Sequence, residues 1–143
     1  MDKYEVLKHC FGHSRFRQGQ EELVDAVLSG RDALGIMPTG GGKSLCYQIP
    51  ALLLGGITIV ISPLISLMKD QVAALKNAGI SAAYINSSLT AEQLRLVYRR
   101  AREGAYNLLY VGPERMETEG FAALMEAVTV SLVAVDEAHC ISQ

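Results

Sequence analysis

The chain has 143 residues, which is enough for one compact domain and too few for a second full one. Half of its residues are apolar and a fifth are charged, so a disordered or collagen-like chain is excluded. The net charge of −2 argues modestly against nucleic-acid binding through an overall basic field, although backbone amides and helix N-termini can still grip a strand.

The cysteines Cys10, Cys46 and Cys140 are scattered singly, without the paired spacing of a disulfide framework. The N-terminus alternates charged and apolar residues and lacks the apolar core of a signal peptide. Both features favour a cytoplasmic protein with reduced thiols. The spacing of His9, Cys10 and His13 could suggest a metal, but a closed zinc site needs four ligands, so we expect none there.

Short apolar segments alternate with helix-like stretches along the chain. The expected strands are Ala33–Met37, Ile57–Ile61, Ala82–Ile85, Leu108–Val111 and Leu132–Val135. Their near-continuous apolar character predicts an α/β fold with a parallel sheet, helices on both faces and right-handed crossovers. A solenoid is the alternative, but no residue pattern repeats from unit to unit. In parallel α/β sheets, ligands bind at the carboxyl ends of the strands.

The stretch Ile49–Leu67 is strongly apolar and about as long as a membrane-spanning helix. Gly55, Gly56 and Pro63 interrupt it. The β-branched run Ile57–Ile61 instead favours a helix end, a glycine turn and a buried strand.

Two helices are expected between the middle strands. In Leu64–Ala78 the apolar residues keep the i, i+3, i+4 spacing, and Gly79 supplies the C-terminal stop. Thr90 opens the second helix, with Gln93 at the capping-box position. The arginines at 95, 99, 100 and 102 could form a DNA patch, but we favour a solvated helix face whose last turn suits cations.

The first expected strand runs directly into Pro38-Thr39-Gly40-Gly41-Gly42-Lys43-Ser44, and a helix is expected from Leu45. Glycines let successive N–H groups point at phosphate oxygens, and the helix N-terminus adds a favourable dipole. Lys43 would reach the β- and γ-phosphates of ATP, and the Ser44 hydroxyl would ligate Mg²⁺. Met37 stands where the strict pattern has glycine. A flexible glycine turn is the alternative, but it need not be followed by Lys-Ser and a helix.

The last expected strand delivers Asp136-Glu137-Ala138-His139 at its carboxyl end. Two adjacent carboxylates there are costly unless they serve a cation. Asp136 can hold Mg²⁺ through its water shell, and Glu137 can orient and deprotonate the attacking water. A strand that ends in solvated charges is the alternative, which the upstream phosphate loop weakens.

The Asp-Glu-Ala-His segment and the upstream Met-Pro-Thr-Gly-Gly-Gly-Lys-Ser segment resemble motifs II and I of the superfamily 2 helicases. The resemblance implies a P-loop NTPase of the RecA-like helicase type. Its ATP site would contain Thr39, Gly40, Gly41, Gly42, Lys43 and Ser44. Lys43, Asp136, Glu137 and His139 would form the catalytic set, with Mg²⁺ on Ser44 and Asp136.

Residues 11–20, Phe-Gly-His-Ser-Arg-Phe-Arg-Gln-Gly-Gln, resemble motif 0 of the RecQ-family DNA helicases, in which a Phe-Arg-x-x-Gln core selects adenine. By this resemblance Gln20 reads the adenine edge, because its amide both donates and accepts. Arg17 would stack on one face of the base. His13 stands where many family members have an aromatic residue, and it would stack less strongly on the other face.

Residues 60–71 and 110–116 resemble motifs Ia and Ib, which implies DNA contacts through Ser62-Pro63 and Gly112–Arg115. Residues 140–143 resemble the opening of the family's aromatic-rich loop. We therefore expect a helical segment with motif 0 at 1–30 and a first RecA-like helicase domain at 31–143, incomplete at its C-terminus.

The resemblance implies an ATP- and Mg²⁺-dependent DNA helicase that moves 3′ to 5′ and serves recombination and repair. Another superfamily 2 motor, such as an RNA helicase or duplex translocase, is an alternative, as is a non-catalytic nucleotide-binding fragment. The family's arginine finger lies in a second RecA-like domain that no part of this sequence matches. We therefore expect the 143-residue chain by itself to be inactive.

Overall fold

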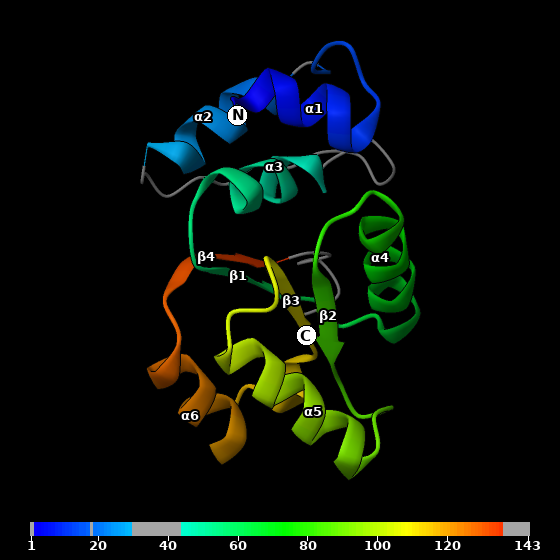
Figure 1. The fold of residues 1–143 in the computed structure, drawn as a ribbon, viewed down its shortest axis with the longest axis vertical. Helices are drawn as coiled ribbons and strands as arrows, with labels where there is room; N and C mark the ends of the chain where they lie inside the picture. Colours follow the sequence, from blue (N-terminus) through cyan, green and yellow to red (C-terminus); the bar gives the residue numbers. More distant parts are fainter. Residues whose placement is uncertain (1, 18, 30–43, 136–143) are drawn as a thin grey trace. The chain divides into compact units, whose positions relative to one another are not determined.

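The computed structural model describes residues 2–17, 19–29 and 44–135 (Figure 1). The chain forms two compact units, Met1–Gly55 and Gly56–Gln143. The expected strand Ala33–Met37, the residues Thr39–Lys43 of the phosphate loop, and Asp136–His139 lie outside the described residues.

The described part of the first unit is helical. Helix α1 spans Lys3–Phe11, α2 spans Gln20–Leu28, and α3 spans Leu45–Leu53. A capping box starts α1, because the Glu5 N–H donates to Asp2 Oδ1 at 2.9 Å and the Asp2 N–H donates to Glu5 Oε1 at 3.4 Å. The three helices share a small core that contains Val6, Leu7, Val24 and Ile49.

Polar contacts on the surface join α1 to α2. Lys3 Nζ lies 2.8 Å from Glu21 Oε2 and 2.5 Å from Asp25 Oδ1, and the Tyr4 hydroxyl donates to Glu21. The hydrogen bonds to Asp25 and Glu21 raise the pKa of Lys3. The hydrogen bonds from Lys3 and Tyr4 lower the pKa of Glu21. We call these four residues the α1–α2 tether.

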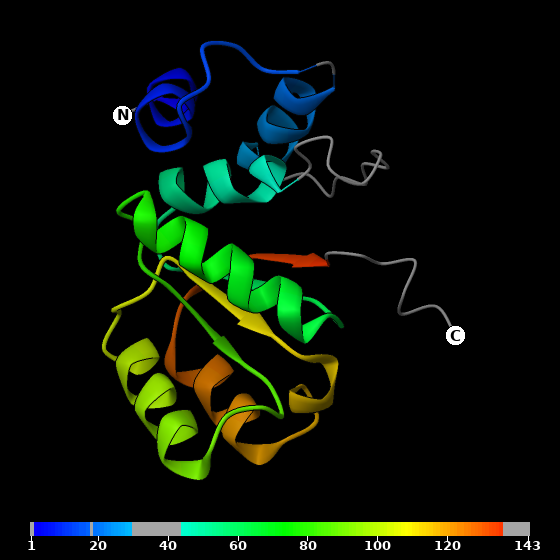
Figure 2. The same cartoon turned by 90° about the vertical axis from the view of Figure 1, so that its right-hand side faces the viewer.

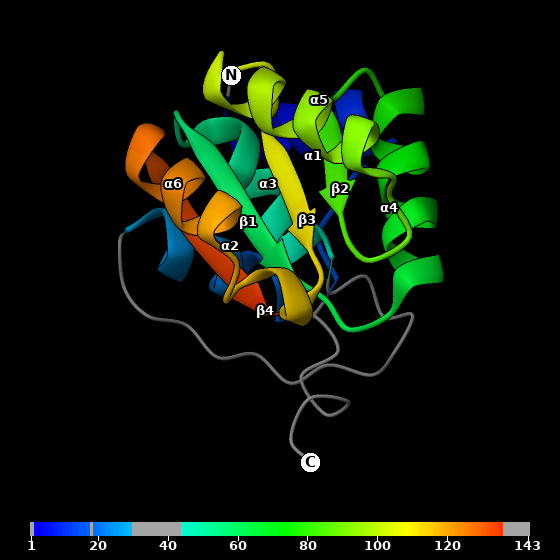
Figure 3. The same ribbon diagram turned by 90° about the horizontal axis from the view of Figure 1, so that it is seen from below.

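The second unit alternates strands and helices. The strands are β1 (Ile57–Ile61), β2 (Ala82–Ile85), β3 (Leu108–Val111) and β4 (Val130–Val135), and the helices between them are α4 (Ile65–Asn77), α5 (Ala91–Arg102) and α6 (Glu119–Ala127). All paired strands are parallel, in the spatial order β2-β3-β1-β4 (Figure 3). This confirms the α/β fold expected from the alternating apolar segments.

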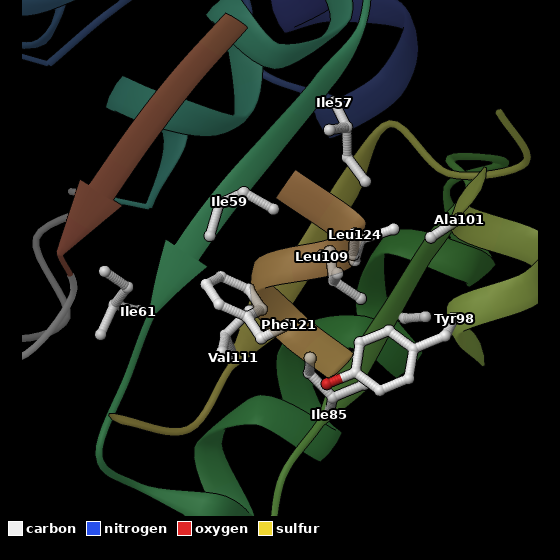
Figure 4. Packing of buried hydrophobic residues seen from close by; sticks show 11 residues of the cluster. Ile57, Ile59, Ile61, Ile85, Tyr98, Ala101, Leu109, Val111, Phe121 and Leu124 are labelled. Carbon is white, nitrogen blue, oxygen red and sulfur yellow. The ribbon is translucent and has the colours of Figure 1, made fainter. Parts of the chain in front are cut away.

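Helices cover both faces of this sheet. On one face, alternate residues of β1, β2 and β3 pack against Tyr98 and Ala101 of α5 and against Phe121 and Leu124 of α6 (Figure 4). Helices α5 and α6 lie side by side there (Figure 2). On the other face α4 packs on β2, and the Tyr110 hydroxyl of β3 donates to Gln71 Oε1 of α4 at 3.5 Å.

The apolar stretch Ile49–Leu67 contains the end of α3, a glycine turn and strand β1, as expected. A Cβ at Gly56 would lie 2.4 Å from the Thr129 carbonyl oxygen, so the close approach of these two segments requires glycine. Its φ of 75° is also a left-handed value that favours glycine. Within the described ranges, no helix is long and apolar enough to cross a membrane.

Strand β4 differs from the expectation in two ways. It begins at Val130, before the expected Leu132, because an irregularity in the register pairs Ile57 with Val130. Its burial alternates along the chain, and Val133 and Val135 remain 56% and 53% exposed. Strand β1, by contrast, is buried along its whole length.

Candidate functional site

The carboxyl ends of the four described strands lie at one edge of the sheet. Ile61 of β1 is in register with Val111 of β3 and Val135 of β4, and Val111 is also in register with Ile85 of β2. The loops that follow β1, β2 and β3 therefore start side by side. We call this the carboxyl edge. The carboxylates predicted for catalysis follow Val135 directly in the sequence, although their own positions lie outside the described residues.

The loop after β1 carries the residues expected to form motif Ia. Ser62 is fully buried, and its N–H donates to the Val111 carbonyl oxygen at 3.1 Å. Its hydroxyl oxygen accepts a hydrogen bond from the Leu64 N–H at 3.5 Å. Leu64 and Ile65 are 40% and 37% exposed. Ser62 therefore shapes the turn, and the accessible surface of this loop begins at the half-buried Pro63.

The loop after β3 carries the residues expected to form motif Ib, and it folds into a 3₁₀ turn at Pro113–Arg115. Gly112 is buried, and its N–H donates to the Ile85 carbonyl oxygen at 2.9 Å. Glu114 is exposed and accepts a hydrogen bond from the backbone of the neighbouring loop, from the Ser87 N–H at 3.0 Å. Arg115 is half-buried.

A third loop, Asn86–Leu89 after β2, also reaches the carboxyl edge, and sequence reasoning did not single it out. Asn86 is 1% exposed. Its Oδ1 accepts from the Ser88 N–H at 2.8 Å and from the Ser88 hydroxyl at 2.5 Å, and its Nδ2 donates to Met68 Sδ at 3.4 Å. The signal that could have revealed this turn is Asn-Ser-Ser directly after an apolar strand, since asparagine favours such side-chain-stabilised turns.

The residues predicted to bind adenine lie in the first unit, at the start of α2. Gln20 is 1% exposed, and its Oε1 accepts from the Arg17 N–H at 2.7 Å, while the Gln20 N–H donates to the Arg17 carbonyl oxygen at 3.0 Å. Arg17 and His13 are exposed. The Gln20 amide thus helps to hold its own turn.

Helix α3 begins at Leu45, where the predicted phosphate loop requires a helix to start. Ser44 is the N-cap residue with helical backbone angles, and its carbonyl oxygen accepts from the Gln48 N–H at 3.0 Å. Helix α3 therefore begins directly after the predicted glycine loop in the sequence, as a phosphate-binding loop requires. Burial raises the pKa of the Cys46 thiol in the first turn of this helix. The approach of Lys43 to the carboxylates Asp136 and Glu137 remains a prediction.

Residues 17–143 match the DEAD/DEAH box helicase family. The chain belongs to this family, and its parallel α/β sheet is consistent with that. Within the family its similarity is to the RecQ group. It is 56% identical over 138 residues to the "ATP-dependent DNA helicase RecQ" of Haemophilus influenzae, and 55% identical over 139 residues to the protein of the same name from Bacillus subtilis.

These matches cover 96% of this chain but only 22% and 24% of the two relatives. The "Probable ATP-dependent DNA helicase RecS" of Bacillus subtilis is 41% identical over 140 residues, which is 97% of this chain and 28% of that protein. The chain therefore spans roughly a quarter of the length of these curated relatives.

Proposed function

We propose that these residues belong to the motor of an ATP-dependent DNA helicase of the RecQ type, which unwinds DNA in the 3′ to 5′ direction during recombination and repair. The observation that carries the proposal is the carboxyl edge, where the loops after β1 and β3 start beside the strand that leads to Asp136. The identity of 55–56% to the named RecQ proteins supports it. The scattered cysteines favour the cytoplasm as its location.

Phosphate binding would fall to the N-terminal turn of α3 and to the loop before it. Lys43 would neutralise charge on the β- and γ-phosphates, and the amides of Thr39–Gly42 would donate to phosphate oxygens. Ser44 and, through water, Asp136 would hold Mg²⁺, which would offset the negative charge of the phosphates. Glu137 would accept a proton from the attacking water, and His139 would complete the catalytic set.

Adenine recognition would fall to the turn before α2. Gln20 can donate through Nε2 and accept through Oε1, the pairing that the adenine edge requires. The exposed Arg17 and His13 side chains could lie against the two faces of the base. Guanine presents the reversed donors and acceptors at this edge, so the same residues would discriminate against GTP.

DNA would lie along the carboxyl edge at the loops of Ser62-Pro63 and Gly112–Arg115, in which the buried Ser62 and Gly112 shape the turns and their neighbours reach the surface. The net charge of −2 gives the chain no overall basic field to attract DNA. Backbone N–H groups in short loops can nevertheless bind the phosphates of a strand. The exposed Leu64 and Met116 side chains add apolar surface at the same edge, where sugars or bases could pack.

The test is a pair of substitutions in the full-length gene product, with ATP hydrolysis measured in the presence of single-stranded DNA. Lys43→Ala should abolish turnover. Glu137→Gln should still bind ATP but hydrolyse it at least ~100-fold more slowly, as expected for a lost general base. Lys76→Ala is the matched control, because this lysine lies in the last turn of α4, away from the carboxyl edge.

Wild-type turnover in either variant would refute the catalytic assignments. Strand separation should be assayed in parallel on DNA and RNA duplexes. Unwinding of RNA alone would point to an RNA helicase, and ATP binding without turnover in the unmodified protein would point to a non-catalytic nucleotide-binding role. Both results would contradict the proposal.

A further inference from the structure

Glu114 places an exposed carboxylate on a surface that is proposed to face the phosphates of DNA. A negative charge there repels the backbone of a strand, so this side chain needs another reason for its position. Its one described hydrogen bond goes to the loop after β2, from the Ser87 N–H at 3.0 Å. These two loops are separated by more than twenty residues in the sequence but start side by side on β2 and β3.

We infer that Glu114 is a positioning residue, which fixes the loop after β2 against the loop after β3 so that the carboxyl edge presents one preformed surface to the DNA strand. The inference rests on the proposed function. It adds the Asn86–Leu89 loop to the strand-binding edge, and it assigns Glu114 to holding the surface, while other residues contact the strand.

The geometry around Gly112 supports this role. A Cβ at this position would lie 2.5 and 2.6 Å from the two carboxylate oxygens of Glu114. The Gly112 backbone angles, φ −69° and ψ 141°, suit any residue, so backbone conformation gives no reason for a glycine here. The Glu114 carboxylate occupies the space that a side chain at position 112 would fill.

The far side of the same loop is fixed as well. The buried Asn86 side chain closes the turn onto Ser88 and donates to Met68 of α4, so the loop is attached to the sheet, to a helix and to Glu114. Loops that are ordered before binding lose less conformational entropy when a strand docks. Loss of the Glu114 contact should therefore weaken DNA binding more than it slows turnover on bound DNA.

The experiment compares substitutions in the full-length gene product. Glu114→Ala removes the acceptor, whereas Glu114→Gln keeps an oxygen that can accept from the Ser87 N–H and removes only the charge. Gly112→Ala leaves Glu114 in place but fills the space of its carboxylate. Glu117→Ala is the control, because this exposed glutamate lies in the same loop.

The first readout is the concentration of single-stranded DNA that gives half-maximal stimulation of ATP hydrolysis. Glu114→Ala and Gly112→Ala should each raise it by ~2–10-fold, the range expected for one lost hydrogen bond, with a smaller change in turnover at saturating DNA. Glu114→Gln, which keeps an acceptor for the Ser87 N–H, and Glu117→Ala should not raise this concentration, and the loss of a repelling negative charge can only lower it. The double variant Gly112→Ala/Glu114→Ala should be no weaker than Glu114→Ala alone, because both changes break the same contact.

Additive effects of the two alanine substitutions would overturn the inference, as would a Glu114→Gln variant as weak as Glu114→Ala. The second readout does not depend on DNA. Hydrogen exchange at the Ser87 amide should be faster in Glu114→Ala than in the wild type and unchanged in Glu114→Gln. If exchange is unchanged in Glu114→Ala, the positioning role is wrong. If exchange responds but DNA stimulates neither the wild type nor any variant, the proposed helicase function is wrong instead.

Discussion

The two units of the chain hold their predicted ligand-contacting loops in different ways. In the Met1–Gly55 unit, one side chain has two tasks, because the Gln20 amide closes its own turn onto Arg17 and is also the predicted reader of adenine. In the Gly56–Gln143 unit the tasks are divided. Asn86 and Glu114 hold the strand-end loops, while neighbouring residues such as Leu64 and Met116 form the exposed surface.

This difference follows from the scaffold available to each unit. The described part of the first unit has a small core between three helices, joined at the surface by the α1–α2 tether. The second unit has a parallel sheet whose strands end in register, so adjacent loops can brace one another. In a loop on such a sheet, the residues that hold the loop in place can differ from those that contact a ligand. The turn before α2 has fewer neighbours of this kind among the described residues.

The largest effect should come from the residue with two tasks. Gln20→Ala removes both the turn contact and the base contact, and Gln20→Glu keeps an acceptor for the Arg17 N–H but loses the donor. Both should lose the preference for ATP over GTP, worth ~1–3 kcal/mol or ~5–150-fold. Only Gln20→Ala should also speed amide exchange at Arg17.

Competition between ATP and GTP for the full-length protein measures this preference, and Glu22→Ala, an exposed substitution on the same helix, is the control. A Gln20→Glu variant that retains the wild-type preference would remove Gln20 from base recognition. The comparison between the two units would then lose its basis, because Gln20 would only hold a turn.

A smaller effect should come from the helix that follows the Asn86–Leu89 loop. Thr90 caps α5 through its hydroxyl, which accepts from the Gln93 N–H at 3.1 Å, and Thr90→Ala should destabilise the start of this helix by ~1 kcal/mol. If Asn86 and Glu114 hold the loop, the half-maximal DNA concentration should stay at the wild-type value.

Hydrogen exchange in α5 and DNA-stimulated ATP hydrolysis measure the two parts of this prediction. Asp2→Ala, the loss of a side-chain cap at the start of α1 in the other unit, is the control. A Thr90→Ala variant with weakened DNA dependence would show that the helix start, and not the Glu114 contact, orders the loop.

The sequence predicted the parts of this fold that repeat locally. The bounds of β1, β2 and β3 agree with the expected strands, because these short runs are apolar and almost wholly buried. The capping box at Thr90 and the stop at Gly79 were also predicted from neighbouring residues, and both are confirmed. Strand β4 was placed less well, because its start depends on an irregular register with β1.

The candidate site was less predictable where distant segments meet. The contact between Glu114 and Ser87 joins two loops that no local period connects, and it exists only because β2 and β3 are neighbours in the sheet. The sequence likewise identified Gln20 as a candidate reader of adenine, but the pattern did not show that its oxygen already accepts from Arg17. The sequence predicted which residue types lie at the strand ends, but it did not predict the hydrogen-bond partner of each side chain.

The smallest expected effect concerns the α1–α2 tether and its dependence on pH. The folded-state pKa of Glu21 is lowered, chiefly by the hydrogen bond from Lys3 and then by that from Tyr4. A group with a depressed pKa stabilises the folded state above its ordinary value of 4.5, and this stabilisation is lost as the pH falls through the lowered value. As the pH is lowered from about 6 to about 3, amide exchange in α1, corrected for intrinsic rates, should therefore become modestly faster.

Lys3→Met should remove most of this pH dependence, and Lys8→Met, an exposed change on the same helix, should keep it. The effect should be small because solvent screens exposed ion pairs. An unchanged pH dependence in Lys3→Met would show that the tether does not hold α1 on α2, and the small apolar core would then be the main support of the turn that carries Gln20.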